Sequence, residues 1–142
     1  MSEGSGALWR YVRDKLLPRD IHATRVENGI SAGFPDVHYT VRHETGISHT
    51  GALELKFLRK KNPPFGEEGL NRDQMIWIRE ELALGGSVWI VADIGKHICM
   101  IRGKFAPVFN GWGRAEFMRN STVILEKRKL TKDRVKEFQL FL

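Results

Sequence analysis

The chain has 142 residues, 42% of them hydrophobic, which fits a single folded domain and argues against intrinsic disorder. Lysine and arginine number 23 against 17 aspartates and glutamates, and the resulting charge of +6 favours a polyanionic partner such as nucleic acid. The charge alone also fits a basic protein with no such partner. We find no apolar run of about 18 residues that could span a membrane and no secretory signal pattern. The single cysteine, Cys99, cannot form an internal disulfide, so we expect a cytoplasmic, non-secreted protein.

The chain begins with a predicted helix. Residues 1–5 are expected to form a flexible tail. Residues 6–17, GALWRYVRDKLL, place Leu8, Val12 and Leu16 on one helical stripe. Pro18 ends this pattern, because proline lacks the backbone N–H that a helix interior needs.

Three short strands are predicted next, over residues 21–28, 36–42 and 51–58. Glycine and proline in GISAGFP, between the first two, indicate a loop, and HETGISHTG before the third indicates a turn. The third strand, within GALELKFL, is unusual because Glu54 and Lys56 interrupt an apolar run. It leads into RKKNPPFGEEG, residues 59–69, a polar loop of a length that is often functional in a small domain.

A second helix is predicted over residues 70–86, with Asn71 as its N-cap and Gly85 and Gly86 at its end. The nearly apolar SVWIVADI, residues 87–94, predicts a central strand buried on both faces. Residues 96–103 are expected to pair with it. We assign Trp77, Trp89 and Cys99 to the core.

Residues 104–142 are expected to form a C-terminal extension, with an edge strand over 123–130 and a final helix whose Val135, Phe138 and Leu142 point inward. The predicted fold is therefore one α/β domain over residues 1–142. Its mixed central sheet is flanked by helices, and its first elements follow the order helix, three strands, helix, strand (αβββαβ).

One group of charged residues calls for a chemical explanation. Glu54 and Lys56 stand two residues apart on a strand, so their side chains leave the same face. A hairpin with the preceding strand could bring Asp36 near Glu54. Two carboxylates suit Mg²⁺, which can activate a water, and a nearby lysine can orient or deprotonate that water and offset phosphate charge. Taken alone, Glu-x-Lys also fits a common surface ion pair, but burying such charges for stability is costly.

These motifs resemble a known group of enzymes. GFPD at 33–36, ELK at 54–56 and the following LNRDQMIWIREELALGGSVWIV are together similar to the PD-(D/E)XK nuclease superfamily. The last segment resembles VRR-NUC domains, which occur in phage nucleases and in the Fanconi-associated nuclease. Archaeal Holliday-junction resolvases are more distant relatives by the same motif. The resemblance covers residues 20–95 and implies a restriction-endonuclease-like core.

The resemblance also implies roles for individual residues. Asp36, Glu54 and the backbone carbonyl of Leu55 would bind Mg²⁺, for which Mn²⁺ can substitute, and Lys56 would be the catalytic lysine. These families carry a further acidic residue upstream, for which we favour Glu27 over Asp14. A solvated carboxylate at a strand end is the alternative for Glu27.

Three further features of the sequence lie near these motifs. Gln74 would support the lysine or the substrate, and it also completes a helix-capping box with Asn71; both roles can hold at once. His38 is interpreted as a polar strand residue near the DNA. The Gly-Trp-Gly at 111–113 lacks a phosphate-loop pattern that would indicate nucleotide binding.

Basic residues around the motifs are candidates for DNA contacts. Arg59, Lys60 and Lys61 directly follow the Glu-x-Lys strand and would meet phosphates beside the scissile one. Arg10, Arg13 and the basic run at 127–129 could extend this track. Solvated surface charges are the ordinary alternative for each of them.

From this resemblance we expect a Mg²⁺-dependent DNA endonuclease, specifically a Holliday-junction resolvase, and the size of the chain fits a phage-encoded protein. Two symmetric cuts require two active sites, so a homodimer is expected, with Phe138, Phe141 and Leu142 available for its interface. The alternatives are a nuclease acting on flaps, ends or duplex DNA, and an inactive DNA-binding module of the same fold. A structural protein with a chance motif is the third alternative.

Overall fold

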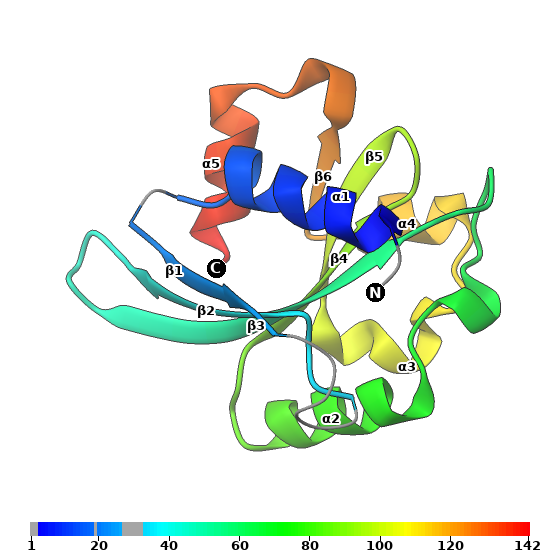
Figure 1. Cartoon of the computed structure of the whole chain (residues 1–142), viewed down its shortest axis with the longest axis horizontal. Coiled ribbons are helices and arrows are strands. Elements are labelled where there is room, and N and C mark those ends of the chain that lie inside the picture. Colours follow the sequence, from blue (N-terminus) through cyan, green and yellow to red (C-terminus); the bar gives the residue numbers. More distant parts are fainter. Residues whose placement is uncertain (1–2, 19, 27–32) are drawn as a thin grey trace.

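A six-stranded mixed sheet with strand order β1-β2-β3-β4-β5-β6 crosses the computed structural model, which describes residues 3–18, 20–26 and 33–142 (Figure 1). The strands are β1 His22–Arg25, β2 Val37–Arg42, β3 Ser48–Phe57, β4 Val88–Asp93, β5 His97–Arg102 and β6 Val123–Glu126. Neighbouring strands are antiparallel except β3 and β4, which are parallel and are joined through a helix. The predicted α/β class, the mixed sheet and the order of the first elements are confirmed.

Helices cover both faces of this sheet. On one face lie α1 Glu3–Tyr11, its continuation η1 Val12–Leu16, and α5 Lys132–Leu140 (Figure 1). On the other face lie α2 Arg72–Ala83, α3 Ala106–Phe109 and α4 Arg114–Asn120. Three short 3₁₀ segments, η2 Gly66–Glu68, η3 Gly103–Phe105 and η4 Lys127–Lys129, connect the larger elements. The first helix starts at Glu3, so the expected tail over residues 1–5 is wrong for residues 3–5; residues 1 and 2 lie outside the described part.

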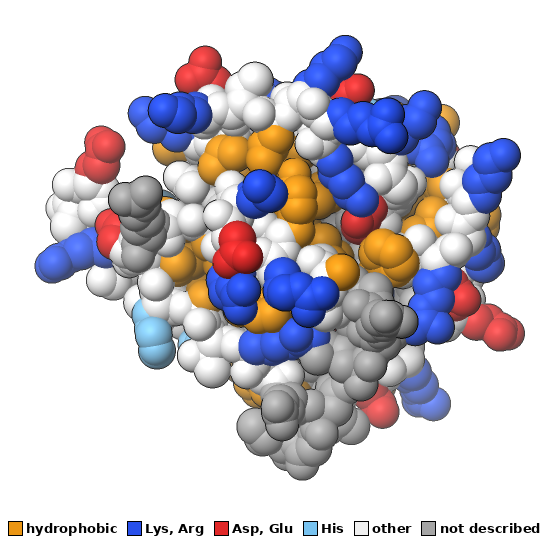
Figure 2. Space-filling model, turned by 45° about the horizontal axis from the view of Figure 1, so that its top comes forward, with side chains coloured by type: hydrophobic (Ala, Val, Ile, Leu, Met, Phe, Trp, Pro, Cys, Tyr) orange, Lys and Arg blue, Asp and Glu red, His pale blue; other side chains and the backbone are white. Residues whose placement is uncertain are grey.

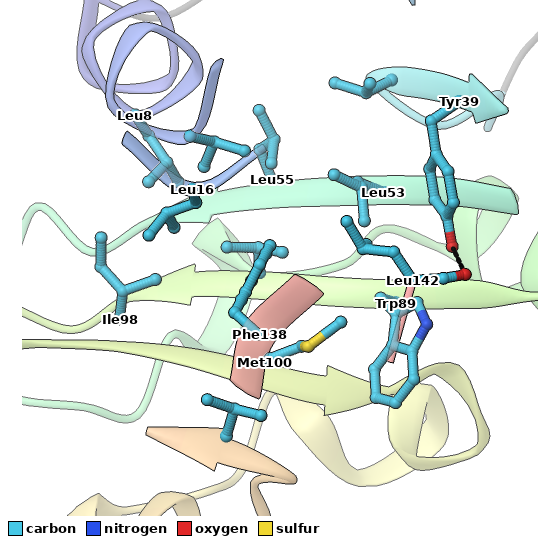
Figure 3. Packing of buried hydrophobic residues seen from close by; sticks show 14 of the residues in the cluster. Leu8, Leu16, Tyr39, Leu53, Leu55, Trp89, Ile98, Met100, Phe138 and Leu142 are labelled. Atoms are coloured by element: carbon cyan, nitrogen blue, oxygen red, sulfur yellow. Dashed lines mark hydrogen bonds between the residues drawn. The ribbon is translucent and has the colours of Figure 1, made fainter. Parts of the chain in front are cut away.

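The core on the α1 and α5 face follows the predicted patterns. Leu8 and Leu16 descend from the helical layer onto Leu55 and its neighbours in β3, while Phe138 approaches from α5 (Figure 3). Leu8 and Leu16 are almost fully buried, because a stripe with a spacing of four residues presents one face of a helix to the sheet. Removing this much apolar surface from water is the main stabilising contribution of the layer.

The end of the chain closes this core instead of offering a free apolar surface. Phe138 and Leu142 are buried in the core, and the Tyr39 hydroxyl donates a hydrogen bond to the carbonyl of Leu142 at 3.4 Å (Figure 3). The predicted inward orientation of Phe138 and Leu142 is confirmed, and the expectation that these two residues also serve a dimer interface is therefore wrong. Only Leu140 and Phe141 remain exposed among the large apolar side chains of this helix and its end.

The second core, on the α2 face, depends on residues 104–142 more than the sequence indicated. Phe109 from α3 and Phe117 from α4 are fully buried there, against Ile78 of α2 and Ile90 of β4. These two helices were not predicted, because four and seven residues are too few to display a helical period. Cys99 lies in the same core, where burial raises the pKa of its thiol to about 11, so it behaves as a small apolar residue.

The sheet topology gathers several strand ends at one edge. Because β3 and β4 are parallel, both end there, and the antiparallel partners β2 and β5 begin there. All six residues of β4 are buried, which confirms the predicted central strand. Asp36 immediately precedes β2 and therefore lies at this same edge. Within the described residues, we find no helix with the length and hydrophobicity that crossing a bilayer requires.

Candidate active site

Glu54 and Lys56 project from β3 toward α2, as the predicted strand alternation requires, while Leu53 and Leu55 enter the opposite core. The Glu54 side chain is only 2% exposed and that of Lys56 14%. The Lys56 Nζ lies 3.7 Å from Glu54 Oε1. A surface ion pair is thereby excluded, and these charges have been moved out of water at a cost in folding free energy.

Asp36 joins this pair from the neighbouring strand. The register Val37 to Leu53 places Asp36 beside the end of β3, and its Oδ2 accepts a hydrogen bond from the Leu55 N–H at 2.8 Å. The N–H and C=O of a strand residue point toward the same neighbouring strand, so the Leu55 carbonyl also points toward the Asp36 side. The predicted convergence of Asp36, Glu54 and the backbone of Leu55 is confirmed as geometry.

Pro35 prevents the neighbouring strand from binding that carbonyl. Continuing the β2–β3 register by two residues places Pro35 opposite Leu55. A residue with an N–H at this position would bind the Leu55 carbonyl within the ladder, but proline has no N–H to donate. The proline of the Pro-Asp motif thus interrupts the β2–β3 hydrogen bonding directly next to Asp36, whose carboxylate belongs to the site.

The electrostatics of the site leave a negative charge only partly compensated. Burial raises the pKa of the Glu54 carboxyl well above its usual range, and the nearby Asp36 carboxylate raises it further. The Lys56 ammonium acts in the opposite direction but does not cancel these effects. A cation bound between the two carboxylates would remove the repulsion.

The donor set fits Mg²⁺. Two carboxylates and a carbonyl are hard oxygen ligands, and Mg²⁺ needs only one or two carboxylates because it keeps several waters. Within the described ranges there is no group of three or more His, Cys, Asp or Glu side chains that could hold a metal ion, so a metal here would depend on the two carboxylates, the carbonyl and water molecules.

Gln74, at the start of α2, links the site to the helix. Its Oε1 accepts from Lys56 Nζ at 3.2 Å and from the Asn71 N–H at 2.9 Å, and its Nε2 donates to Glu54 Oε1 at 3.0 Å. The Asn71 side chain completes the capping box by accepting from the Gln74 N–H. Both roles considered for Gln74 therefore coexist, and the helix cap holds the lysine and the glutamate at fixed positions.

A close contact with α2 also positions the segment before Asp36. Gly33 has φ +79°, and a Cβ added there would lie 2.2 Å from the Asp73 carbonyl oxygen. The Phe34 ring packs 5.4 Å from the Trp77 ring, centre to centre. The glycine and phenylalanine of the GFPD motif thus hold the loop against the helix that carries Gln74. The sequence alone did not explain why these two residues precede Pro-Asp.

Gly33→Ala is expected to lower both the melting temperature and any activity that depends on Asp36, because a Cβ would collide with rigid backbone. Gly46→Ala is the matched control: its φ is +85°, but nothing lies within 4 Å of the added Cβ. The control should cost only the left-handed backbone penalty of about 1–2 kcal/mol. Thermal unfolding of both variants measures the difference, and equal losses would contradict the close contact.

The remaining predicted residues lie in different parts of the molecule. Arg59, Lys60 and Lys61 are exposed just beyond β3, with Lys60 Nζ 3.4 Å from the Pro64 carbonyl. Arg10 and Arg13 are exposed on α1 and η1, on the sheet face opposite Glu54, and so do not join this cluster. This face carries many Lys and Arg side chains interspersed with apolar ones (Figure 2).

The upstream acidic residue is only partly located. Asp14 is exposed on η1, and its Oδ1 is 2.8 Å from Arg13 Nε, an interaction that lowers the pKa of the Asp14 carboxyl. It lies on the helical layer away from Glu54. Glu27 is outside the described residues, but the N–H of the preceding Val26 donates to the Asp36 carbonyl at 2.8 Å. The described part of the chain therefore runs beside Asp36 as far as Val26. His38 is exposed on β2, as a polar strand residue.

No protein-family model matches the chain, and no curated protein is significantly similar to it. The interpretation of the site therefore depends on its own geometry and chemistry and on the resemblance of its short motifs.

Proposed function

We propose that this protein is a metal-dependent DNA endonuclease with a PD-(D/E)XK, restriction-endonuclease-like core, which hydrolyses phosphodiester bonds. One observation carries the proposal: two carboxylates and the backbone of Leu55 meet at a strand end beside a mostly buried lysine. Folding alone gives no reason for this arrangement, because each buried charge costs free energy. A reaction at a phosphate accounts for all of its members.

The residues divide the chemistry among them. Asp36, Glu54 and the Leu55 carbonyl would hold Mg²⁺ or Mn²⁺, which, when bound, supplies an activated water and neutralises charge on the phosphate. An ammonium has three donors. Lys56 directs one at Gln74 and lies near Glu54, so a further N–H is left for the attacking water or a phosphate oxygen. The water gives up one proton as its oxygen bonds to phosphorus, the bond from phosphorus to the leaving oxygen breaks, and the leaving oxygen takes up a proton.

For the substrate we propose branched DNA, a four-way junction cut by a homodimer. The net charge of +6 and the exposed Arg59, Lys60 and Lys61 support a nucleic-acid substrate. The preference for junctions follows the resemblance to resolvases. Leu140, at 74% exposure, and the partly exposed Phe141 remain the apolar residues on α5 and its end that a partner could cover. Flaps, ends and linear duplexes are the alternative substrates.

A cleavage assay tests the proposal. The protein is incubated with end-labelled four-way junction, flap, single-stranded and linear duplex DNA, in Mg²⁺, in Mn²⁺ and in EDTA. Symmetric nicks in the junction alone, absent in EDTA, are expected, and light scattering should give the mass of a dimer. Cutting of the flap or the linear duplex instead would replace the junction specificity. Binding without cutting under any condition would make the protein an inactive module.

A further inference from the structure

Basic residues lie in a row along the sheet edge that carries the candidate site, leading away from the site. β4 ends at Asp93 beside Phe57 of β3, and the chain then turns through Gly95 and Lys96 into β5. β6 pairs antiparallel with β5 through His97 and Glu126, so it ends at this edge and leads into η4. Three segments therefore reach the same edge: residues 59–61 after β3, Lys96 before β5, and residues 127–129 after β6.

An ion pair between the buried Asp93 and the half-buried Lys127 fixes the far end of this row. Lys127 Nζ lies 2.6 Å from Asp93 Oδ2, and the Asp93 Oδ1 accepts from the Gly95 N–H at 3.0 Å. The Lys127 N–H also donates to the Lys96 carbonyl at 3.1 Å. These contacts tie η4 to the β4–β5 turn and neutralise the Asp93 carboxylate, which is only 5% exposed. Lys127 is therefore a structural anchor.

The neighbouring basic residues are available to a partner. Lys96, Arg128 and Lys129, which we call the β6 edge cluster, are exposed and form no ion pair with any described residue. Two hollows open beside them. One of about 490 Å³ is lined by Lys96 and Arg128, and one of about 360 Å³ by Lys129 and Arg134. Glu126 lines both hollows and is the acidic residue that offsets part of this charge.

We propose that the β6 edge cluster binds the phosphate backbone of a DNA arm that leaves the active site along this edge, across β4 and β5. The inference rests on the proposed function, because the path is taken to start at the active site beside Lys56. Adjacent strands lie about 4.8 Å apart, so the path from β3 to β6 is roughly 14 Å long. That length corresponds to about four base pairs at 3.4 Å each, so one arm can contact both the site and the cluster.

Binding of a 24-base-pair duplex, measured by fluorescence anisotropy in EDTA from 50 to 200 mM KCl, tests this path without any cleavage. The variant K96A/R128A/K129A is expected to bind roughly 10²–10³-fold more weakly at 100 mM salt, because three lost contacts each contribute about 0.9 log unit over the decade from 1 M to 0.1 M salt. Its slope of log K against log[salt] should be smaller by roughly 2–3, since each phosphate contact contributes about 0.9. The control R42A/R79A/K104A removes the same charge from exposed positions outside this row and should change the slope by less than about 0.5.

The outcomes separate this inference from the proposed function. An unchanged affinity and slope in the cluster variant, or equal losses in the control, would overturn the path along β6 and leave the nuclease proposal standing. A slope that falls only in the cluster variant supports the path even if no substrate is ever cut. Lys96→Gln and Arg128→Gln, each expected to lower the slope by about 1, keep the test decisive if the triple variant does not fold.

Discussion

Replacing Glu54 with glutamine is expected to abolish cleavage and, without divalent metal, to stabilise the fold at pH 8. The carboxylate is buried beside Asp36, so its charge opposes folding until a cation binds. Glutamine keeps an oxygen that can accept from Gln74 Nε2 and removes the charge. Loss of a metal ligand should reduce the rate at least about 10³-fold, since one electrostatic stabiliser of a transition state alone contributes roughly 10²–10³.

The stabilisation should depend on pH in a defined direction. The pKa of Glu54 is raised in the folded state, so the folded protein holds the proton more tightly than the unfolded chain does. Its favourable contribution is therefore complete at low pH and is lost as pH rises from the ordinary glutamate value to the raised value. Each unit of raised pKa removes about 1.4 kcal/mol. The melting-temperature difference between E54Q and the original protein should widen over this range in EDTA and shrink when Mg²⁺ is added.

Asp36→Asn and an exposed control complete this experiment. Asp36→Asn should also abolish cutting, while both site variants still bind DNA in EDTA. Glu44 is exposed in the β2–β3 turn, and Glu44→Gln should change neither activity nor the pH dependence of stability. If E54Q still cleaves DNA, the assignment of the Glu54 carboxylate to the active site is wrong.

Lys56→Met is expected to reduce the cleavage rate about 10²–10³-fold, with DNA affinity in EDTA changed less than about threefold. Methionine preserves the unbranched stem but supplies no donor for the water or the phosphate. The variant should also unfold more easily at pH 8, because Lys56 is the cation that lowers the pKa of Glu54. Single-turnover cleavage and thermal unfolding measure the two effects separately.

A double-mutant cycle distinguishes catalysis from charge balance. In the K56M/E54Q variant the stability lost through Lys56→Met should be largely recovered, because no buried carboxylate remains to be compensated. Lys104, exposed in η3, supplies the control variant Lys104→Met, for which no change in rate is expected. A K56M protein that cuts at the original rate would show that Lys56 serves the fold and not the reaction.

The sequence predicted those parts of the molecule that depend on short-range periodicity. Alternation in GALELKFL placed Glu54 and Lys56 on one face, and the capping box identified Asn71 and Gln74 at a helix start. The continuous apolar run of SVWIVADI predicted a strand buried on both faces. These features depend on residues only a few positions apart in the sequence, where local sterics and hydrogen bonding decide the structure.

Features that depend on contacts between distant segments could not be predicted in this way. α3 and α4 are too short to show a period. The inward orientation predicted for Phe138 and Leu142 is confirmed, but the sequence did not show that their burial within the chain leaves neither of them for an interface. The need for glycine at position 33 comes from its positive φ and from the Asp73 carbonyl packed against it, and Asp73 lies forty residues further along the chain. The upstream acidic ligand stays a prediction at Glu27.

By itself the sequence determined the layered α/β class and the set of groups that the proposed reaction would use: two carboxylates, a lysine and a glutamine. Only the tertiary structure decided that Pro35 faces Leu55, that Gln74 bridges Lys56 and Glu54, and that Lys96 shares an edge with residues 127–129. The physical reason is strand register. A shift of one residue would turn each side chain to the other face, and the packing of both cores fixes that register at once.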